Sequence, residues 1–351
     1  MAPKPPRPTW RLGRIQNRFL NPPPETGRRA PRPDVARYRA ETRNFHLKVH
    51  VLGSAAGGGF PQWNCNCPNC DACRKGSKGF TARTQSSITV STDQENWLIF
   101  NASPDILQQI RSFPALQPAR ALRDTAIRAV LLMDAQIDHT TGLYMLREHR
   151  QPHELWCHAL VRDDLVSGNP LFKVLGHYCG INWHDVPLQG DGFEMPGVPG
   201  LHFTALPLIS NAPPYSPHRD RPQPGDNVGV TILEPATGKK IFYAPGLGQM
   251  EPHVWAAMQA ADCVLVDGTL WTDDEMITLG ASKKTSRAMG HMPQTGPGGM
   301  LEWLDQLPAS TRKVLIHINN TNPILDEEGA ERQELTRRGI EVAYDGMEID
   351  L

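Results

Sequence analysis

Three short apolar segments of this sequence each end at a side chain that can bind a metal or carry a proton. The segments and the residues that follow them are Ala129–Met133 with Asp134, Val264–Val266 with Asp267, and Val314–Ile316 with His317. Apolar runs of this length are typical of buried strands, and open α/β sheets place their sites at the carboxyl ends of such strands. The pattern therefore predicts a sheet-based fold with a site at these three strand ends.

The rest of the pattern predicts a mixture of strands and helices. Early strands follow one another with short turns, whereas later strands alternate with helices. Further strands are predicted at Ser87–Ser91, Trp97–Asn101, Leu155–His158, His202–Leu208, Gly229–Glu234, Lys240–Ala244 and Glu341–Ala343. Helices are predicted at Pro104–Ser112, Gly142–Arg150, Val161–Asn169, Glu251–Ala261, Gly298–Gln306 and Glu328–Arg338. This order favours an α/β layered domain of roughly 300 residues, with mixed sheets inside and helices outside.

The folded part is predicted to begin near Phe45. Apolar and polar residues alternate over Phe45–Val51, as in a half-buried strand, and a glycine-rich loop follows at Gly53–Gly59. The loop matches neither common phosphate-binding motif. Its glycines indicate instead a backbone that packs close to another group.

Residues 1–44 differ in composition from the rest of the chain. They contain eleven Arg or Lys residues against three acidic residues, and nine of the 32 prolines. Such a segment buries too little apolar surface to offset its ordering entropy, so we predict a disordered Pro/Arg-rich extension before a domain at 45–351. It lacks the apolar run of a secretory signal. A transit peptide, a nucleic-acid-binding arm and an upstream start site are left open.

Charge and hydropathy exclude two broad classes of protein. The 351 residues include 36 basic and 37 acidic ones, for a net charge of -1. This balance argues against a nucleic-acid-binding protein with a broad positive field. No apolar run approaches the ~18 residues that a membrane-spanning helix needs, so no membrane span is expected.

Four of the seven cysteines lie within nine residues, at Cys65, Cys67, Cys70 and Cys73. This spacing lets the thiolates converge on one tetrahedral ion, so we predict a structural zinc, with a histidine from elsewhere as the alternative to Cys73. Four free thiols and a redox dithiol are the other interpretations, and the second is disfavoured because the sequence shows no helix start after the cluster. The odd cysteine count and the lack of a signal peptide indicate a reduced, cytoplasmic protein.

The first strand end carries the sequence Asp134-Ala-Gln136-Ile-Asp138-His139-Thr-Thr-Gly142. A single Asp-His pair also occurs in helix caps and turns. Metal binding gains support because two other strand ends supply a carboxylate and an imidazole.

This arrangement resembles the metallo-β-lactamase superfamily, whose fold is an α/β αββα sandwich with two mixed sheets. The superfamily motif normally reads His-x-His-x-Asp-His-x-x-Gly. Asp138 and His139 match it, but Asp134 and Gln136 replace the two leading histidines. The Ser210-Asn211 pair lies where another metal-binding histidine usually occurs. The resemblance therefore implies that one of two metal positions is lost.

Longer segments narrow the resemblance to the PqqB family of pyrroloquinoline quinone (PQQ) biosynthesis proteins. The segments are Gly53–Cys70, Asp134–Leu143, Gly290–Gln294, Leu315–Pro323 and Tyr344–Glu348, within a similarity that covers residues 45–351. The resemblance implies one mononuclear iron site, with the ligands Asp138, His139, Asp267 and His317.

The chemistry of this ligand set favours oxidation over hydrolysis. Two imidazoles and two carboxylates suit Fe(II), Mn(II) or Zn(II), and sets of two histidines and one carboxylate are used to activate oxygen. Loss of the second cation removes the two-metal clamp of many hydrolases. His291 is a candidate proton donor or substrate contact, unless it is a core or helix-end histidine. Asp134 and Gln136 face the vacated metal position and are candidates for binding a substrate amine or water, unless they bind nothing.

The resemblance implies an iron- and O₂-dependent hydroxylase that acts on a Glu-Tyr-derived precursor of PQQ. The alternative is a carrier that takes part in transport of PQQ or its precursor to the periplasm. A metal-dependent hydrolase is the third interpretation. PQQ or its precursor is the expected partner, whereas contacts with other PQQ-pathway proteins and a homodimer remain open.

Overall fold

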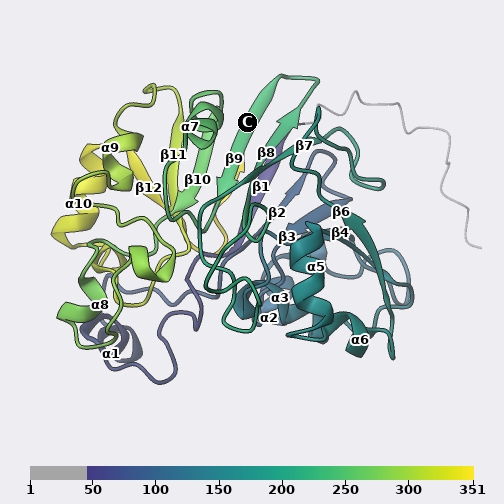
Figure 1. Cartoon of the computed structure of the whole chain (residues 1–351), viewed down its shortest axis with the longest axis horizontal. Coiled ribbons are helices and arrows are strands. Elements are labelled where there is room, and N and C mark those ends of the chain that lie inside the picture. Colours follow the sequence, from purple (N-terminus) through teal and green to yellow (C-terminus); the bar gives the residue numbers. More distant parts are fainter. Residues whose placement is uncertain (1–45) are drawn as a thin grey trace, which may run out of the picture. The chain divides into compact units, whose positions relative to one another are not determined.

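Two β-sheets pack face to face in the computed structural model, which describes residues 46–351 (Figure 1). Their inner faces share one apolar core, in which Val49 and Phe100 of the first sheet lie with Phe203 and Tyr243 of the second. All four side chains are fully buried. Burial of apolar surface between two sheets is the main source of stability in such a sandwich. The predicted disordered extension at residues 1–44 lies outside the described residues.

The two sheets account for the strands of the described residues. The first sheet has the order β13 (Glu348–Asp350), β1 (Lys48–Gly53), β2 (Ser87–Ser91), β3 (Trp97–Phe100), β4 (Ile127–Leu131), β5 (His153–Cys157) and β6 (Ile181–Asp185). The second has the order β12 (Ile340–Val342), β11 (Arg312–Ile316), β10 (Cys263–Asp267), β9 (Lys239–Ala244), β8 (Val228–Glu234) and β7 (His202–Pro207).

Both sheets are mixed. In the first, β13, β1, β2 and β3 pair in antiparallel fashion, and β3 to β6 are parallel. In the second, β7, β8 and β9 are antiparallel, and β9 to β12 are parallel. Parallel strands need crossover connections, which the later helices provide.

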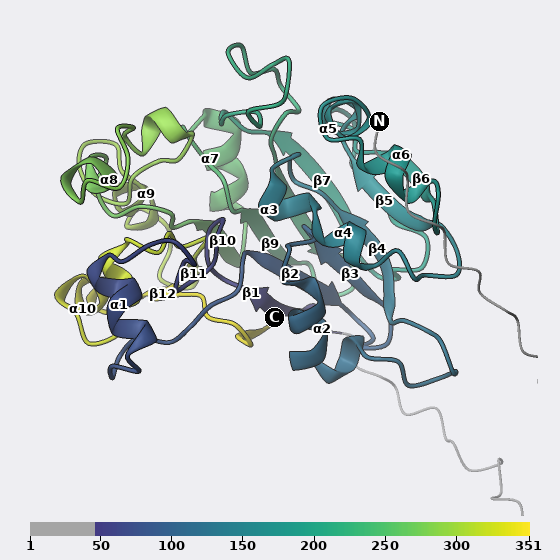
Figure 2. The ribbon, with the colours of Figure 1, turned by 90° about the horizontal axis from the view of Figure 1, so that it is seen from below.

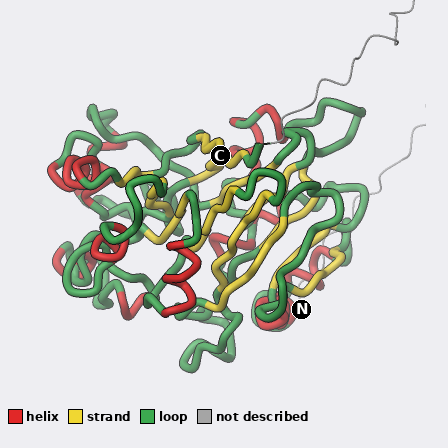
Figure 3. Tube along the Cα trace, turned by 90° about the horizontal axis from the view of Figure 1, so that it is seen from above, coloured by secondary structure: helices red, strands yellow, loops and turns green. Residues whose placement is uncertain are grey.

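Helices cover the outer face of each sheet, so that strands fill the middle of the described fold (Figures 2 and 3). Those packed on the first sheet are α2 (Ile106–Ser112), α4 (Gly142–Met145), α5 (Ala159–Val166) and α6 (Leu171–Leu175). Those packed on the second are α7 (Pro252–Gln259), α9 (Met300–Leu304) and α10 (Ala330–Arg337). The predicted αββα sandwich with two mixed sheets is confirmed. None of the described helices has the length and apolar character needed to span a membrane.

Three short helices lie near the strand ends and the cysteine cluster. They are α1 (Pro68–Arg74), α3 (Ile137–Thr140) and α8 (Glu275–Thr278). Helix α1 begins directly after Cys67, within the cysteine cluster, and was not predicted. Pro68 at the first helical position suits a helix N-terminus and was a usable signal for this start.

The two sheets are joined at the end of β4. The amide of Val228 donates a hydrogen bond of 2.9 Å to the carbonyl of Met133. Asp134 and Asn227 form a single antiparallel bridge at the same place. The residues that follow β4 are thereby held beside the second sheet, where β10 and β11 end.

Candidate metal centre

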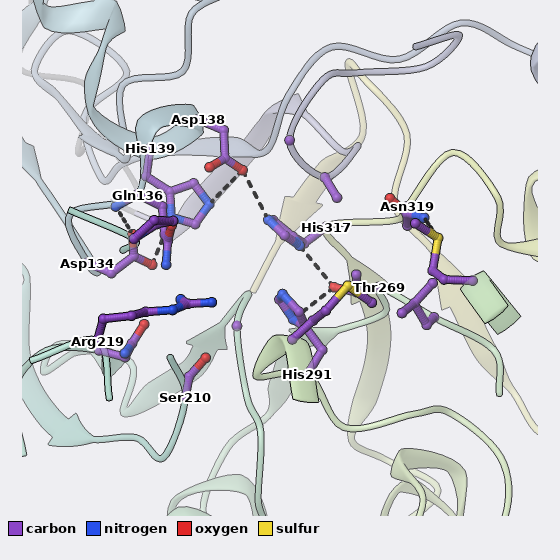
Figure 4. A pocket seen from close by; sticks show the side chains of 18 residues that line it. Asp134, Gln136, Asp138, His139, Ser210, Arg219, Thr269, His291, His317 and Asn319 are labelled. Carbon is purple, nitrogen blue, oxygen red and sulfur yellow. Dashed lines mark hydrogen bonds and ion pairs between the residues drawn. The ribbon is translucent and has the colours of Figure 1, made fainter. Parts of the chain in front are cut away.

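The predicted strand ends at Asp134 and His317 meet at one cavity of about 280 Å³, whereas Asp267 is fully buried and does not line it (Figure 4). Asp134, Asp138 and His139 reach it from the segment after β4, and His317 reaches it from the end of β11. The cavity therefore lies between the two sheets, at the carboxyl ends of strands from both. Open sheets commonly place binding sites at this position.

Both ring nitrogens of His139 have defined surroundings. Its Nδ1 lies 2.8 Å from each carboxylate oxygen of Asp134, so that Nδ1 carries the proton and donates it to this carboxylate. Its Nε2 is buried and makes no hydrogen bond with the described residues. The same Nε2 lies 3.7 Å from Oδ2 of Asp138. An unpartnered buried lone pair beside a carboxylate fits a metal ligand.

His317 is oriented in a similar way from the other sheet. Its Nδ1 lies 2.9 Å from the hydroxyl of Thr269, and its Nε2 lies 3.5 Å from Oδ2 of Asp138. The backbone of His317 has a φ of 63°, in the left-handed region that is uncommon for residues with a side chain. Such strain is found mainly where the surrounding structure requires a particular side-chain direction. Asp138, His139 and His317 thus present ligand atoms that all lie within 4.8 Å of one another.

The charges in this group favour a cation. Burial opposes the charge of Asp138, but His139 and His317 hold its pKa well below its usual range. Burial also opposes the charged form of His139, but the carboxylates of Asp134 and Asp138 raise its pKa to about 9. The carboxylates that stabilise a proton on His139 would equally stabilise a divalent metal bound to its Nε2.

A second group, of Asp267, His291 and His317, shares His317 with the first. Oδ2 of Asp267 accepts hydrogen bonds from Nδ1 of His291 at 2.7 Å and from the amide of Leu247 at 2.8 Å. Its Oδ1 accepts two more from Thr269, from the amide at 2.9 Å and from the hydroxyl at 2.6 Å. Burial lowers the pKa of His291, but the adjacent Asp267 raises it overall. Both oxygens of Asp267 are therefore committed to protein donors.

The residues predicted to contact substrate have different surroundings. Both oxygens of Asp134 face His139, and its Oδ1 also accepts the amide of Gln136 at 2.8 Å. The side-chain amide of Gln136 lines the cavity and donates to the carbonyl of Asn211 at 3.1 Å. His291 lines the cavity as well. Asp134 thus acts on His139, whereas Gln136 and His291 remain candidates for substrate contact.

Several residues that line the cavity were missed in the sequence, among them Thr269, Arg219 and Asn227. Thr269 lies two residues after Asp267, and its hydroxyl contacts both His291 and His317. Its position close to a predicted ligand was a usable signal. Arg219 lies in the irregular segment between β7 and β8, where no periodic pattern points to a role.

Two glycines allow close approaches around the centre. A Cβ on Gly57 would lie 3.0 Å from Oδ2 of Asp138, so the glycine-rich loop packs directly on this carboxylate. A Cβ on Gly142 would lie 2.1 Å from the carbonyl of Ser103, which explains the last residue of the Asp-His-x-x-Gly motif. The prediction that the loop backbone packs close to another group is confirmed.

The cysteine cluster lies at the start of helix α1. The thiols of Cys65, Cys67 and Cys70 lie within 4.8 Å of one another, and Cys73 is not part of this group. The side-chain nitrogen of Asn320 lies 3.1, 3.6 and 3.3 Å from the three sulfurs in that order. Three converging thiols suit zinc, which binds sulfur in tetrahedral sites. A fourth ligand from Cys73 stays a prediction.

Comparison with known proteins gives a consistent result. Residues 96–318, more than half of the chain, match the family described as "Beta-lactamase superfamily domain". The "Coenzyme PQQ synthesis protein B" of Azoarcus sp. (strain BH72) is 74% identical over 305 residues, covering 87% of this chain and 100% of that protein. The protein of the same name from Methylobacillus flagellatus is 62% identical over 306 residues, with the same coverage.

A solved structure agrees with these relatives. The crystal structure of Zn(2+)-bound PqqB from Methylobacterium extorquens has a TM-score of 0.79 and 36% sequence identity to this chain. The match covers 87% of this chain and 100% of that one. The chain therefore belongs to the coenzyme PQQ synthesis protein B family, within the β-lactamase superfamily.

Proposed function

We propose that this chain acts in PQQ biosynthesis as an iron- and O₂-dependent hydroxylase of a Glu-Tyr-derived precursor. Its relatives are named for PQQ synthesis, which supports the pathway. The observation that carries the reaction type is the convergence of two imidazole nitrogens on one carboxylate oxygen. Nε2 of His139 and Nε2 of His317 lie 3.7 and 3.5 Å from Oδ2 of Asp138.

This donor set fits Fe(II). Two imidazoles and one carboxylate with open positions make the ligand set of many non-haem iron oxygenases. Asp138, His139 and His317 would hold the ion. Asp267, the fourth ligand that the resemblance implies, has both oxygens bonded to protein donors and would orient His291 instead. Bound there, Fe(II) would supply the activation of O₂ for hydroxylation. Mn(II) or Zn(II) would fit the same donors, and Zn(II) would not support redox chemistry.

The other residues of the site orient these ligands and handle protons. Asp134 and Thr269 hold the protons on Nδ1 of His139 and His317, which leaves both Nε2 atoms free. Asp267 does the same for His291, whose other ring nitrogen is then available to a molecule in the cavity. With its pKa raised, His291 suits the role of proton donor to a developing anion on the substrate.

The overall reaction has a simple balance. Conversion of an aromatic C–H to C–OH by one O₂ also forms one water, and it consumes two electrons and two protons beyond the substrate. A chemical reductant such as ascorbate supplies the electrons in an assay. A C–O bond to one oxygen atom of O₂ replaces the C–H bond, whose hydrogen leaves as a proton, and the second oxygen atom ends in the water.

The test is anaerobic loading with Fe(II), followed by addition of precursor, ascorbate and O₂. Mass spectrometry should show incorporation of isotopically heavy oxygen from O₂ into the precursor. His139→Ala should abolish the incorporation, whereas His177→Ala, which changes an exposed histidine, should retain it. Unchanged precursor alongside tight binding of PQQ would overturn the hydroxylase and favour the carrier. Heavy oxygen gained only from water would favour the hydrolase.

A further inference from the structure

One wall of the metal cavity carries side-chain N–H donors that the described residues pair only in part. This wall is formed by the segment between β7 and β8 together with Gln136, on the side where the superfamily motif would place two further histidines. Arg219 projects into this part of the cavity, toward the space between Gln136, Ser210 and His291 (Figure 4). The position of the lost metal ligands is thus faced by a permanent positive charge.

Within residues 46–351, Arg219 is the only Arg or Lys that lines this cavity. With the described residues its guanidinium makes one hydrogen bond, from Nη1 to the carbonyl of Ala212, and no ion pair. A guanidinium carries five N–H donors, so most of its capacity is unused. The carboxylates of the cavity do not compensate it, because Asp134 bonds His139 and Asp138 faces both imidazoles of the metal group.

The side-chain amide of Asn227 is a second unpaired donor at this cavity, and it indicates a bound ligand independently of Arg219. Asn227 lines the cavity and is 5% exposed. Its Nδ2 is buried and makes no hydrogen bond with the described residues. A buried amide without a partner is costly, so a native protein retains one where something else satisfies it. The amide of Gln136 has one further N–H beyond its bond to Asn211.

We propose that Arg219 and Asn227 form a subsite for a carboxylate group of the substrate, in place of the lost second cation. The inference rests on the proposed function, because the carboxylate belongs to the Glu-Tyr-derived precursor or to PQQ. A carboxylate accepts two parallel bonds from the fork of a guanidinium and has no donor to conflict with these N–H groups. Held at Arg219, the ligand would extend across the cavity toward Asp138 and His317.

The test measures binding to the full chain loaded with Zn(II), which keeps the metal but blocks oxidation. PQQ is compared with its trimethyl ester by calorimetry, because the ester keeps the ring system and loses the negative charges. A second pair, N-acetyltyrosine and its neutral amide, is measured by nuclear magnetic resonance and does not depend on PQQ recognition. Arg219→Gln removes the charge, and Arg219→Lys keeps the charge without the fork. Arg221→Gln is the matched control, because Arg221 is exposed on the same segment and does not line the cavity.

We expect the wild type to bind PQQ more tightly than the ester. Arg219→Gln should weaken PQQ binding at least tenfold and leave ester binding unchanged. Arg219→Lys and Asn227→Ala should cause smaller losses, and Arg221→Gln none. Equal affinity for acid and ester, or full PQQ affinity in Arg219→Gln, would overturn the subsite.

If the chain does not act in PQQ biosynthesis, the binding measurements should give a different pattern. If the wild type binds neither PQQ nor its ester, the assignment to PQQ chemistry loses its support. The tyrosine pair then decides the subsite alone. A preference for the acid over the amide that Arg219→Gln removes supports the subsite, whereas no preference or no binding contradicts it.

Discussion

The Asp134 carboxylate determines which nitrogen of His139 faces the other metal ligands. Its two oxygens both lie 2.8 Å from Nδ1, so the ring presents Nε2 toward Asp138. Carboxylates in this position fix the tautomer and increase the basicity of a metal-binding histidine. Asp134, which stands where the superfamily has a metal-binding histidine, thus orients the metal ligand His139.

Asp134→Asn should lower affinity for the metal by about 10- to 100-fold, because the neutral amide no longer stabilises the ring and can favour the other tautomer. The shape of the side chain is nearly unchanged, so the melting temperature of the metal-free protein should change little. A metal titration with a competing chelator measures the affinity. Asp220→Asn, at an exposed carboxylate, is the control. Unchanged metal affinity in Asp134→Asn would show that Asp134 does not act through His139.

The buried carboxyl of Glu275 should make the free energy of unfolding depend on pH. Burial raises the pKa of this carboxyl to about 7 from an ordinary value of 4.5. The folded state therefore favours the protonated form, and its contribution to the free energy of unfolding is present at low pH and lost as pH rises from about 4.5 to about 7. Thr321 and the amide of Trp271 donate hydrogen bonds to it and only partly offset the burial.

Glu275→Gln should remove this dependence. The variant should be more stable than the wild type at pH 8, by roughly 1–3 kcal/mol, and nearly equal to it at pH 5. Urea unfolding at both pH values measures the difference. Glu194→Gln, at an exposed carboxyl, should show no such pH-dependent gain. An equal gain at both pH values would mean that the raised pKa is not the cause.

At the scale of elements, helix α1 and the segment after β11 belong to one unit. Asn69 on α1 donates to the carbonyls of Asn320 and Asn322, at 3.2 and 2.9 Å. The Asn320 side chain reaches the three clustered thiols, and His317 lies three residues before it. An ion bound by the thiols would therefore stabilise the segment that carries His317.

Cys67→Ser should remove one zinc per chain and lower the free energy of unfolding by several kcal/mol, because zinc binding is coupled to ordering of the loop. Elemental analysis of the purified variant, together with urea unfolding, checks both effects. The same analysis on Cys73→Ser and Asn320→Ala identifies the fourth ligand, since the variant that lacks it will release zinc more readily to a chelator. Cys179→Ser, outside the cluster, is the control. Unchanged zinc content in Cys67→Ser would refute the site.

The elements that could be predicted are those whose own residues carry a pattern. The β2 range is identical to its prediction, because all five of its residues are buried and flanked by turns. The β6 and β13 strands were missed: β6 is partly exposed, and β13 has only three residues, so neither shows a clear period. Helix α4 ends at Met145 rather than Arg150. Helix α1 was missed because its seven residues carry no apolar period.

The residues of the candidate site also divide into those that could be predicted from the sequence and those that could not. Asp138, His139 and His317 could be predicted because the segments that carry them follow buried strands. That these segments meet across the two sheets was implied only by the resemblance to the superfamily. The role of Asp134 could not be predicted. The sequence shows that a carboxylate replaces a metal ligand, but it does not show whether this carboxylate faces the substrate or His139. Arg219 could not be predicted either, since the segment that carries it has no periodic pattern.

At the scale of the whole molecule, the metal group joins the two halves of the sandwich. Asp138 and His139 follow β4 of the first sheet, whereas His317 follows β11 of the second. A ligand that binds only the folded state stabilises it, by about 2.7 kcal/mol at a free concentration of 100 times Kd. Metal binding should therefore stabilise the packing of the sheets against each other.

Metal added to protein with a zinc-loaded cysteine cluster should raise the melting temperature of the wild type. His139→Ala should lose most of this rise, while its metal-free form melts close to the metal-free wild type, because the residue serves the metal more than the core. Differential scanning fluorimetry with and without Zn(II) measures both quantities. His177→Ala should behave as the wild type. A large loss of stability in metal-free His139→Ala, with the metal-induced rise retained, would make His139 structural.

The most direct test of the account is the location of iron in crystals of the protein loaded anaerobically with Fe(II). Anomalous scattering at the iron edge distinguishes the two groups that share His317. We predict one iron per chain at this cavity, bound to Oδ2 of Asp138 and to Nε2 of His139 and His317. Two irons, or a single iron between Asp267 and His291 with His139 unbound, would contradict the mononuclear centre.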